Sequence, residues 1–145
     1  MGHVRGCLFP DDLFYDVEAN VWVRPEDDHS ITVGMTSYAC ALSGPLISYT
    51  PKKAGKSVKR EKSCVTVESG KWVGPVKAPV NGSVLEVNAV LFDTPGLIND
   101  DPYGEGWLIR LQPDDWQGEL ALLKTGAAAA AAFEDKMAED GFEGC

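Results

Sequence analysis

The chain has 145 residues, of which 44% are hydrophobic and 24% charged. This length supports one well-packed core but not two ordinary domains, so we expect a single domain over residues 1–145. The formal net charge of -9 argues against nucleic acid as a partner, because phosphate contacts require a basic surface. The sequence also lacks an apolar run of about 18 residues, so we expect no membrane partner.

Four cysteines are scattered along the chain at positions 7, 40, 64 and 145. Their spacing does not match a zinc site or a redox motif, so we expect no metal. Unpaired cysteines of this kind are typical of small buried hydrophobic residues in a reducing compartment. The sequence therefore indicates a cytoplasmic protein, and it leaves disulfide formation open.

Short β-type runs dominate the first 111 residues. Residues 21–24 and 30–33 predict a hairpin, and Thr36 or Ser37 can cap a short helix that ends before Gly44. Further strands are expected at residues 46–49, 64–68, 72–76, 83–87 and 106–111. Residues 91–102 are rich in turn formers. Short, evenly spaced strands of this kind predict a mostly β sandwich or flattened barrel.

A helix is expected near the C-terminus. Asp114 or Asp115 can cap it, Gly126 interrupts it, and residues 127–132 are all alanine, which has the highest helix propensity. Its expected apolar face consists of Leu120, Leu123 and Phe133. We expect residues 138–145 to form a frayed tail.

The most informative local feature is a lysine between two β-type runs. Glu68, Ser69 and Gly70 precede Lys71, and Trp72 follows it. Ser69 and Gly70 favour a turn, which places Lys71 at a hairpin tip where a modifying ligase can reach its amine. A lone lysine at such a tip is more often only a solvated charge. Whether Lys71 is modified therefore has to be judged from the surrounding sequence.

From about residue 14 to residue 137, the chain resembles the H-protein of the glycine cleavage system. The resemblance rests on several stretches in order, at residues 22–24, 31–36, 67–71, 78–84, 86–88 and 99–108. It implies a lipoyl-domain-type fold, a barrel-sandwich hybrid with flanking helices and a C-terminal helix. It also implies that Lys71 carries covalent lipoate as an amide and that Glu68 helps to present the site to the ligase.

Two departures from the family pattern point to a particular branch. Asn20 stands where H-proteins usually have histidine, and Gly70 and Trp72 replace the usual valine and alanine beside the lysine. With Cys40 and Cys64 added, the chain is most similar to the lipoate-binding proteins of the sulfur-oxidising, heterodisulfide-reductase-like system. Trp72 can offer the dithiolane an aromatic platform. We therefore expect a carrier in sulfur oxidation, with the H-protein of glycine cleavage, carrying aminomethyl groups, as the alternative.

Either branch implies a carrier that relays groups by thiol–disulfide chemistry and has no catalysis of its own. The implied partners are a lipoate ligase or lipoyl-assembly enzymes, dihydrolipoamide dehydrogenase, and either the heterodisulfide-reductase-like complex or the glycine cleavage enzymes. Cys64 and, less so, Cys40 are candidates for an assisting thiol, although strand cysteines are usually inert.

Two other classes of protein compete with this interpretation. A biotinyl carrier also bears its cofactor on a hairpin lysine, but biotin sites typically flank the lysine with methionines. An unmodified interaction protein would use the same fold for docking alone. Six basic residues within positions 52–62 offer a surface for an acidic partner, although most such runs are only solvated: Lys52, Lys53, Lys56, Lys59, Arg60 and Lys62.

Overall fold

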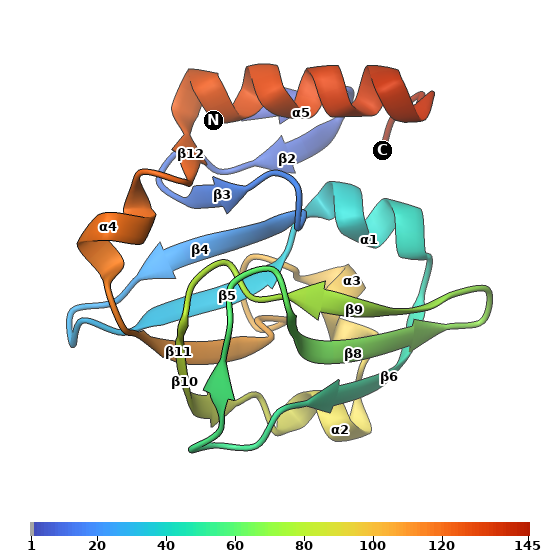
Figure 1. Ribbon diagram of the computed structural model, residues 1–145. Coiled ribbons are helices and arrows are strands. Elements are labelled where there is room, and N and C mark those ends of the chain that lie inside the picture. The colour runs from blue at the N-terminus through green and yellow to red at the C-terminus, as the bar shows by residue number, and fades with distance from the viewer. Residues whose placement is uncertain (1) are drawn as a thin grey trace.

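The computed structural model describes residues 2–145 (Figure 1). The strands are β1 (Gly2–Val4), β2 (Cys7–Phe9), β3 (Phe14–Asp16), β4 (Val21–Pro25), β5 (Ile31–Met35), β6 (Leu46–Pro51), β7 (Ser57–Val58), β8 (Ser63–Ser69), β9 (Val73–Lys77), β10 (Gly82–Val87), β11 (Ile109–Pro113) and β12 (Lys124–Thr125). The helices are α1 (Ser37–Ser43), α2 (Val90–Asp93), α3 (Leu97–Asp100), α4 (Trp116–Leu120) and α5 (Gly126–Asp140).

Within residues 2–145 the strands form three sheets that do not close into a barrel. The largest has seven strands in the order β12-β3-β4-β5-β11-β10-β7, the second has the order β6-β8-β9, and β1 pairs with β2. The pairings inside these sheets are antiparallel, and α5 lies across β1 and β3 (Figure 1). The fold is therefore mostly β with flanking helices and a C-terminal helix, as expected.

The main core lies between the seven-stranded sheet and the β6-β8-β9 sheet. Alternating residues of β8, including Val65 and Val67, are buried in it, whereas Thr66 and Glu68 point to solvent. This period-2 pattern is what an antiparallel sheet with one covered face produces. A second core under α5 contains Tyr15, Trp22, Tyr38 and Phe133.

The expected early hairpin and short helix are confirmed. β4 pairs with β5 in register from Val21 opposite Met35 to Pro25 opposite Ile31. The helix α1 begins after Thr36, whose hydroxyl accepts a hydrogen bond from the backbone N–H of Ala39 at 3.0 Å. Thr36 is thus the N-cap of the helix that ends before Gly44.

The region from residue 91 to residue 102, expected to be turns, contains the two short helices α2 and α3. Their N-cap residues, Ala89 and Gly96, make no side-chain capping bond. Tertiary packing therefore accounts for them better than local signals, because Leu91 and Ile98 are fully buried in the main core.

The prediction of a single, interrupted helix after residue 113 is wrong. Asp115 caps α4, accepting from the N–H of Gly118 at 3.1 Å, but α4 ends at Leu120. The next residues add the edge strand β12 to β3, and a new helix, α5, then begins. Gly126, with a φ of 57°, starts this second helix.

The prediction that residues 138–145 form a frayed tail is also wrong. α5 continues to Asp140, and the N–H of Phe142 donates to the carbonyl of Met137 at 2.9 Å. Cys145 forms a disulfide with Cys7, with their Cα atoms 5.0 Å apart. The tail is therefore fastened to the N-terminal hairpin, and two of the four cysteines are not the unpaired thiols that the spacing suggested.

No helix of residues 2–145 is both long enough and apolar enough to cross a membrane.

Candidate functional site

The tip between β8 and β9 is a tight turn built around Ser69. The N–H of Ser69 donates to the carbonyl of Trp72 at 2.7 Å, and the N–H of Lys71 donates to the Ser69 hydroxyl at 3.3 Å. Ser69 itself is buried. Because the serine is fixed beneath the turn, the intervening residues Gly70 and Lys71 are pushed outward into solvent.

Lys71 is exposed at this tip, and its side chain extends toward the end of α1. A β carbon built on Gly44 would lie 3.1 Å from Cε and 3.7 Å from Nζ of Lys71. Gly44 has a φ of 75° and a ψ of -176°, a conformation that is essentially restricted to glycine. The glycine after α1 therefore leaves space for the lysine, and it does so with a backbone that only glycine adopts readily.

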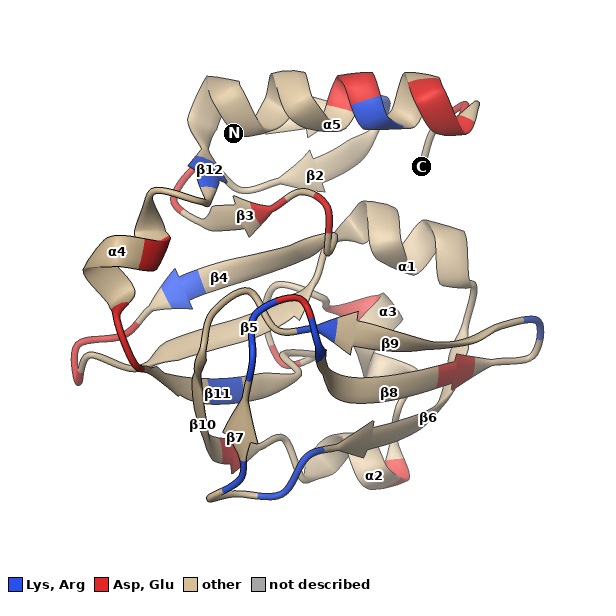
Figure 2. Cartoon of the chain, in the orientation of Figure 1, with Lys and Arg blue, Asp and Glu red and all other residues tan. Residues whose placement is uncertain are grey.

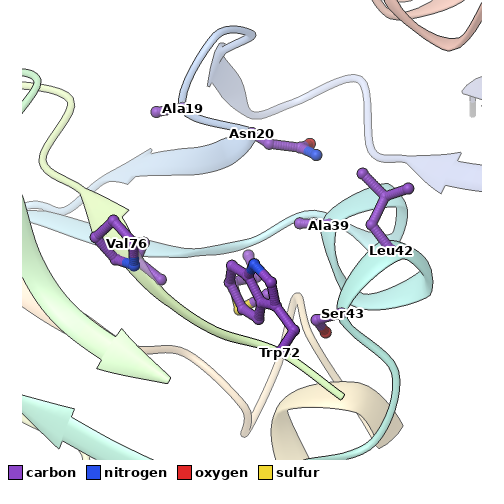
Figure 3. A pocket seen from close by; sticks show the side chains of 9 residues that line it. Ala19, Asn20, Ala39, Leu42, Ser43, Trp72 and Val76 are labelled. Carbon is purple, nitrogen blue, oxygen red and sulfur yellow. The ribbon is translucent and has the colours of Figure 1, made fainter. Parts of the chain in front are cut away.

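Trp72 lies against its own strand. A β carbon on Gly74 would come within 2.2 Å of the Trp72 ring, so the absence of a side chain at position 74 makes room for the indole. Trp72 is 39% exposed, and its ring faces a cleft (Figure 3). Trp72 thus forms one wall of this cleft, next to the exposed lysine.

The cleft has a volume of about 210 Å³ and lies between α1, β9 and the turn before β4 (Figure 3). Most of its lining is apolar, and the polar exceptions are Asn20 and Ser43. Its lining residues are Ala19, Asn20, Met35, Ala39, Leu42, Ser43, Trp72, Pro75 and Val76. A small apolar group tethered to Lys71 would find here a surface that shields it from water.

Asn20 connects two walls of the cleft. Its φ is 60°, in the left-handed region that asparagine tolerates better than most residues. Its side-chain carbonyl accepts a hydrogen bond from the Thr36 hydroxyl, and its backbone carbonyl accepts from the N–H of Thr36 at 3.3 Å. The residue that departs from the H-protein pattern therefore holds the N-terminus of α1 against β4.

Glu68 and Gly70 flank the lysine with less structural constraint. Glu68 ends the β8–β9 pairing opposite Val73, and its side chain is exposed. Gly70 has open space around its Cα, and its φ lies outside the left-handed region. The turn therefore does not depend on the conformational freedom of glycine at position 70, which corrects the reason for expecting a turn there.

Cys40 and Cys64, the candidates for an assisting thiol, are both buried and free. Cys64 donates to the carbonyl of Val76 at 3.5 Å, and Cys40 donates to the carbonyl of Ile98 at 3.5 Å. Burial raises the pKa of each thiol to about 12. Because the thiolate is the reactive form, this environment disfavours exchange chemistry at either residue.

Sequence reasoning located the lysine, its neighbours and Trp72, but not the opposite wall of the cleft. That wall comes from α1, where Ala39, Leu42 and Ser43 follow helical spacing and lie on one face. The spacing is visible in the sequence. What it cannot show is that this face of α1 is turned toward β9.

The profile of the family described as "Glycine cleavage H-protein" matches residues 13–136. Glycine cleavage system H protein 5 of Aquifex aeolicus is 43% identical over 145 residues, covering 97% of each chain. The H protein of Halorhodospira halophila is 41% identical, covering 91% of this chain and 97% of its own.

Among solved structures, the crystal structure of a glycine cleavage system H protein from Mycobacterium marinum matches with a TM-score of 0.74. It is 32% identical, and the match covers 85% of this chain and 97% of the other. Members of this family carry lipoate covalently on a lysine and act as lipoyl carriers without catalysis of their own. The chain belongs to the glycine cleavage H-protein family.

Proposed function

We propose that Lys71 is the residue that carries lipoate and that the chain shuttles lipoyl-bound groups between enzymes. The observation that carries this proposal is the position of Lys71: it is exposed at the tip of the β8–β9 hairpin, beside an apolar cleft. An enzyme can reach its amine from outside, and the attached group can then be sheltered by the chain itself.

The bond-forming step of attachment requires only the lysine amine from this chain. The deprotonated Nζ attacks the carbonyl carbon of an activated lipoyl group and forms an N–C bond. The bond between that carbon and the oxygen of the leaving group breaks, and the leaving group takes the electron pair. The nitrogen loses a proton to give a neutral amide. The exposed Glu68, three residues before the lysine, is placed for recognition by the attaching enzyme.

When bound, lipoate supplies a dithiolane whose disulfide accepts a group or electrons from one enzyme and delivers them to another. The chain's own contribution is to hold and shelter this ring. Trp72 presents an aromatic face, and sulfur–aromatic contacts contribute roughly 0.3–1.5 kcal/mol. Leu42 and Val76 complete an apolar surface across the cleft. Such contacts favour a resting position of the arm without fixing it.

Glycine cleavage is the pathway that the relatives favour, since each of them is named for it. In that role the arm carries aminomethyl groups. The proposed partners are the glycine cleavage enzymes, dihydrolipoamide dehydrogenase, and a lipoate ligase or lipoyl-assembly enzymes. A cytoplasmic location is part of the same proposal.

Sulfur oxidation with a heterodisulfide-reductase-like complex is the second candidate. This candidate rests on Asn20 and Trp72, two departures from the usual H-protein pattern that line the same cleft.

Intact mass measurement tests the carrier proposal. We would express the chain with lipoate and a lipoate ligase, beside Lys71→Arg and the matched control Lys77→Arg on the same hairpin. The proposal requires one lipoyl increment on the wild type and on Lys77→Arg, and none on Lys71→Arg. An unmodified wild type would favour the docking protein instead, and a biotin-sized increment in host-derived protein would favour the biotinyl carrier.

Transfer of an aminomethyl group to the lipoyl arm distinguishes glycine cleavage from sulfur oxidation. The lipoylated chain is incubated with glycine and the glycine decarboxylase of its host, with a second H-protein of that host as the positive control. An aminomethyl increment supports glycine cleavage. A positive control that is loaded while this chain is not favours sulfur oxidation.

A further inference from the structure

Six lysines lie away from Lys71, partly at the opposite end of the β6-β8-β9 sheet and partly on either side of β7 in the seven-stranded sheet. In Figure 2 the basic segments follow the chain from the end of β6, past β7, to the start of β8, and a further one lies at the end of β9. All six side chains are exposed. We call them the lysine strip: Lys52, Lys53, Lys56, Lys59, Lys62 and Lys77.

None of the strip lysines forms an ion pair with any residue from 2 to 145. Arg60, which sits among them in the sequence, behaves differently. It is half-buried and pairs with Glu61 at 3.0 Å and with Asp16 at 4.0 Å. The charge of Arg60 is therefore neutralised within the chain, whereas the charges of the strip lysines are available to a partner.

The backbone beneath the strip is fixed by hydrogen bonds to neighbouring strands. The N–H of Lys52 donates to the carbonyl of Cys64 at 2.9 Å, and the carbonyl of Lys56 accepts from Val84 at 2.8 Å. The carbonyl of Lys62 accepts from Ala78 at 2.8 Å. The six charges are thus presented on an ordered surface, which reduces the entropy cost of docking compared with a flexible basic tail.

The strip is a local exception on an acidic molecule. Residues 52–77 contain eight of the 13 basic residues and only two of the 22 acidic ones. The remaining residues hold five basic and 20 acidic side chains. A nucleic acid or an anionic membrane that approached the strip would meet repulsion from most of the surrounding surface, whereas an acidic patch on a protein can match the strip alone.

A partner that binds at Lys71 can also reach the strip at Lys62. β8 runs from Ser63 to Ser69, so Lys62 and Lys71 are separated along the sheet by about 25–30 Å at roughly 3.3 Å per residue. A protein interface of standard size covers about 800 Å² on each partner, a patch roughly 30 Å across. One enzyme bound along the β8–β9 hairpin can therefore contact both ends.

We propose that the lysine strip docks an acidic face of the enzyme that attaches lipoate to Lys71; this rests on the proposed function. Before attachment, the chain presents the six strip charges together with the charge of Lys71. Amide formation removes the last of these. An acidic attaching enzyme consequently binds the unmodified chain more tightly than its product, which favours product release.

The test is the rate of lipoylation by the recombinant attaching enzyme of the same host, at low and at high salt. The variant Lys56→Glu/Lys59→Glu reverses two strip charges, and Lys124→Glu/Lys136→Glu makes the same change in charge elsewhere. Lys56→Arg/Lys59→Arg preserves the charge. Circular dichroism confirms that each variant is folded.

We expect the strip reversal to lower kcat/KM at low salt by about tenfold or more, mainly through KM, and to flatten its salt dependence. The other two variants stay within about twofold of the wild type. Equal rates for all chains overturn the docking proposal while leaving Lys71 as the attachment residue. Failure to lipoylate even the wild type at Lys71 overturns the proposed function. Unchanged rates with strip-dependent binding to anionic lipid vesicles overturn the docking proposal in favour of a membrane.

Discussion

Lys71 and Gly44 are neighbours across the rim of the cleft: a β carbon at position 44 would lie 3.1 Å from Cε of Lys71. The contact joins the turn that ends β8 to the residue that ends α1. The space available to the lysine thus depends on a glycine 27 positions earlier in the chain, whose own conformation a side chain would strain.

Gly44→Ala is expected to destabilise the protein by about 1–3 kcal/mol, because a φ of 75° with a ψ of -176° is unfavourable for any residue with a β carbon. Urea unfolding measures the loss. Gly70→Ala is the matched control, since nothing lies within 4 Å of the position a β carbon would take there. Equal effects of the two substitutions would contradict the strain at Gly44.

Trp72→Ala is expected to expose the dithiolane of the lipoylated chain. Its reduction by a phosphine should become about two- to tenfold faster, the change that corresponds to losing a contact of roughly 0.3–1.5 kcal/mol. Val73→Ala serves as the control, because Val73 is 60% exposed and does not line the cleft. An unchanged reduction rate in Trp72→Ala would show that the ring does not rest against the indole.

The Cys7–Cys145 disulfide should stabilise the chain by about 2–5 kcal/mol, because it closes nearly the whole chain into one loop. Unfolding in urea with and without a thiol reductant measures this difference. In Cys145→Ser, the reductant should make no difference, and the stability should equal that of the reduced wild type. A wild type with the same stability in both conditions would argue against the bond.

Asp16 should make stability depend on pH. Burial raises the pKa of this carboxyl above its usual value of 3.8, while the Ala19 N–H and Arg60 only partly offset the effect. The native state therefore holds the proton more tightly than the unfolded chain, and this contribution to stability is lost as the pH rises through the native pKa.

Asp16→Asn removes this titration. The free energy of unfolding of the variant, relative to the wild type, should thus increase from about pH 4 upward until the native carboxyl is fully ionised. Urea unfolding of both proteins across this range provides the comparison. A difference that stays constant, or that grows as the pH falls, would show that the pKa of Asp16 is not raised.

Features encoded locally were predictable from the sequence. Strands such as β8 alternate buried and exposed residues, Thr36 is a standard N-cap, and Lys71 lies between two β-type runs. Long-range features were not. The split between α4 and α5 depends on the pairing of β12 with β3, and the disulfide depends on the two ends of the chain meeting under α5. The cleft likewise requires α1 and β9 to face each other.

The attachment of lipoate to Lys71 is tested most directly by peptide mapping of the protein purified from its own host. Trypsin cleaves after Lys62, Lys71 and Lys77 when these are free, which gives peptides 63–71 and 72–77. A lipoyl amide on Lys71 blocks the middle cleavage. We predict an uncut peptide 63–77 that carries one lipoyl increment. Complete cleavage after residue 71, in protein that is active in its host, would contradict lipoylation of Lys71.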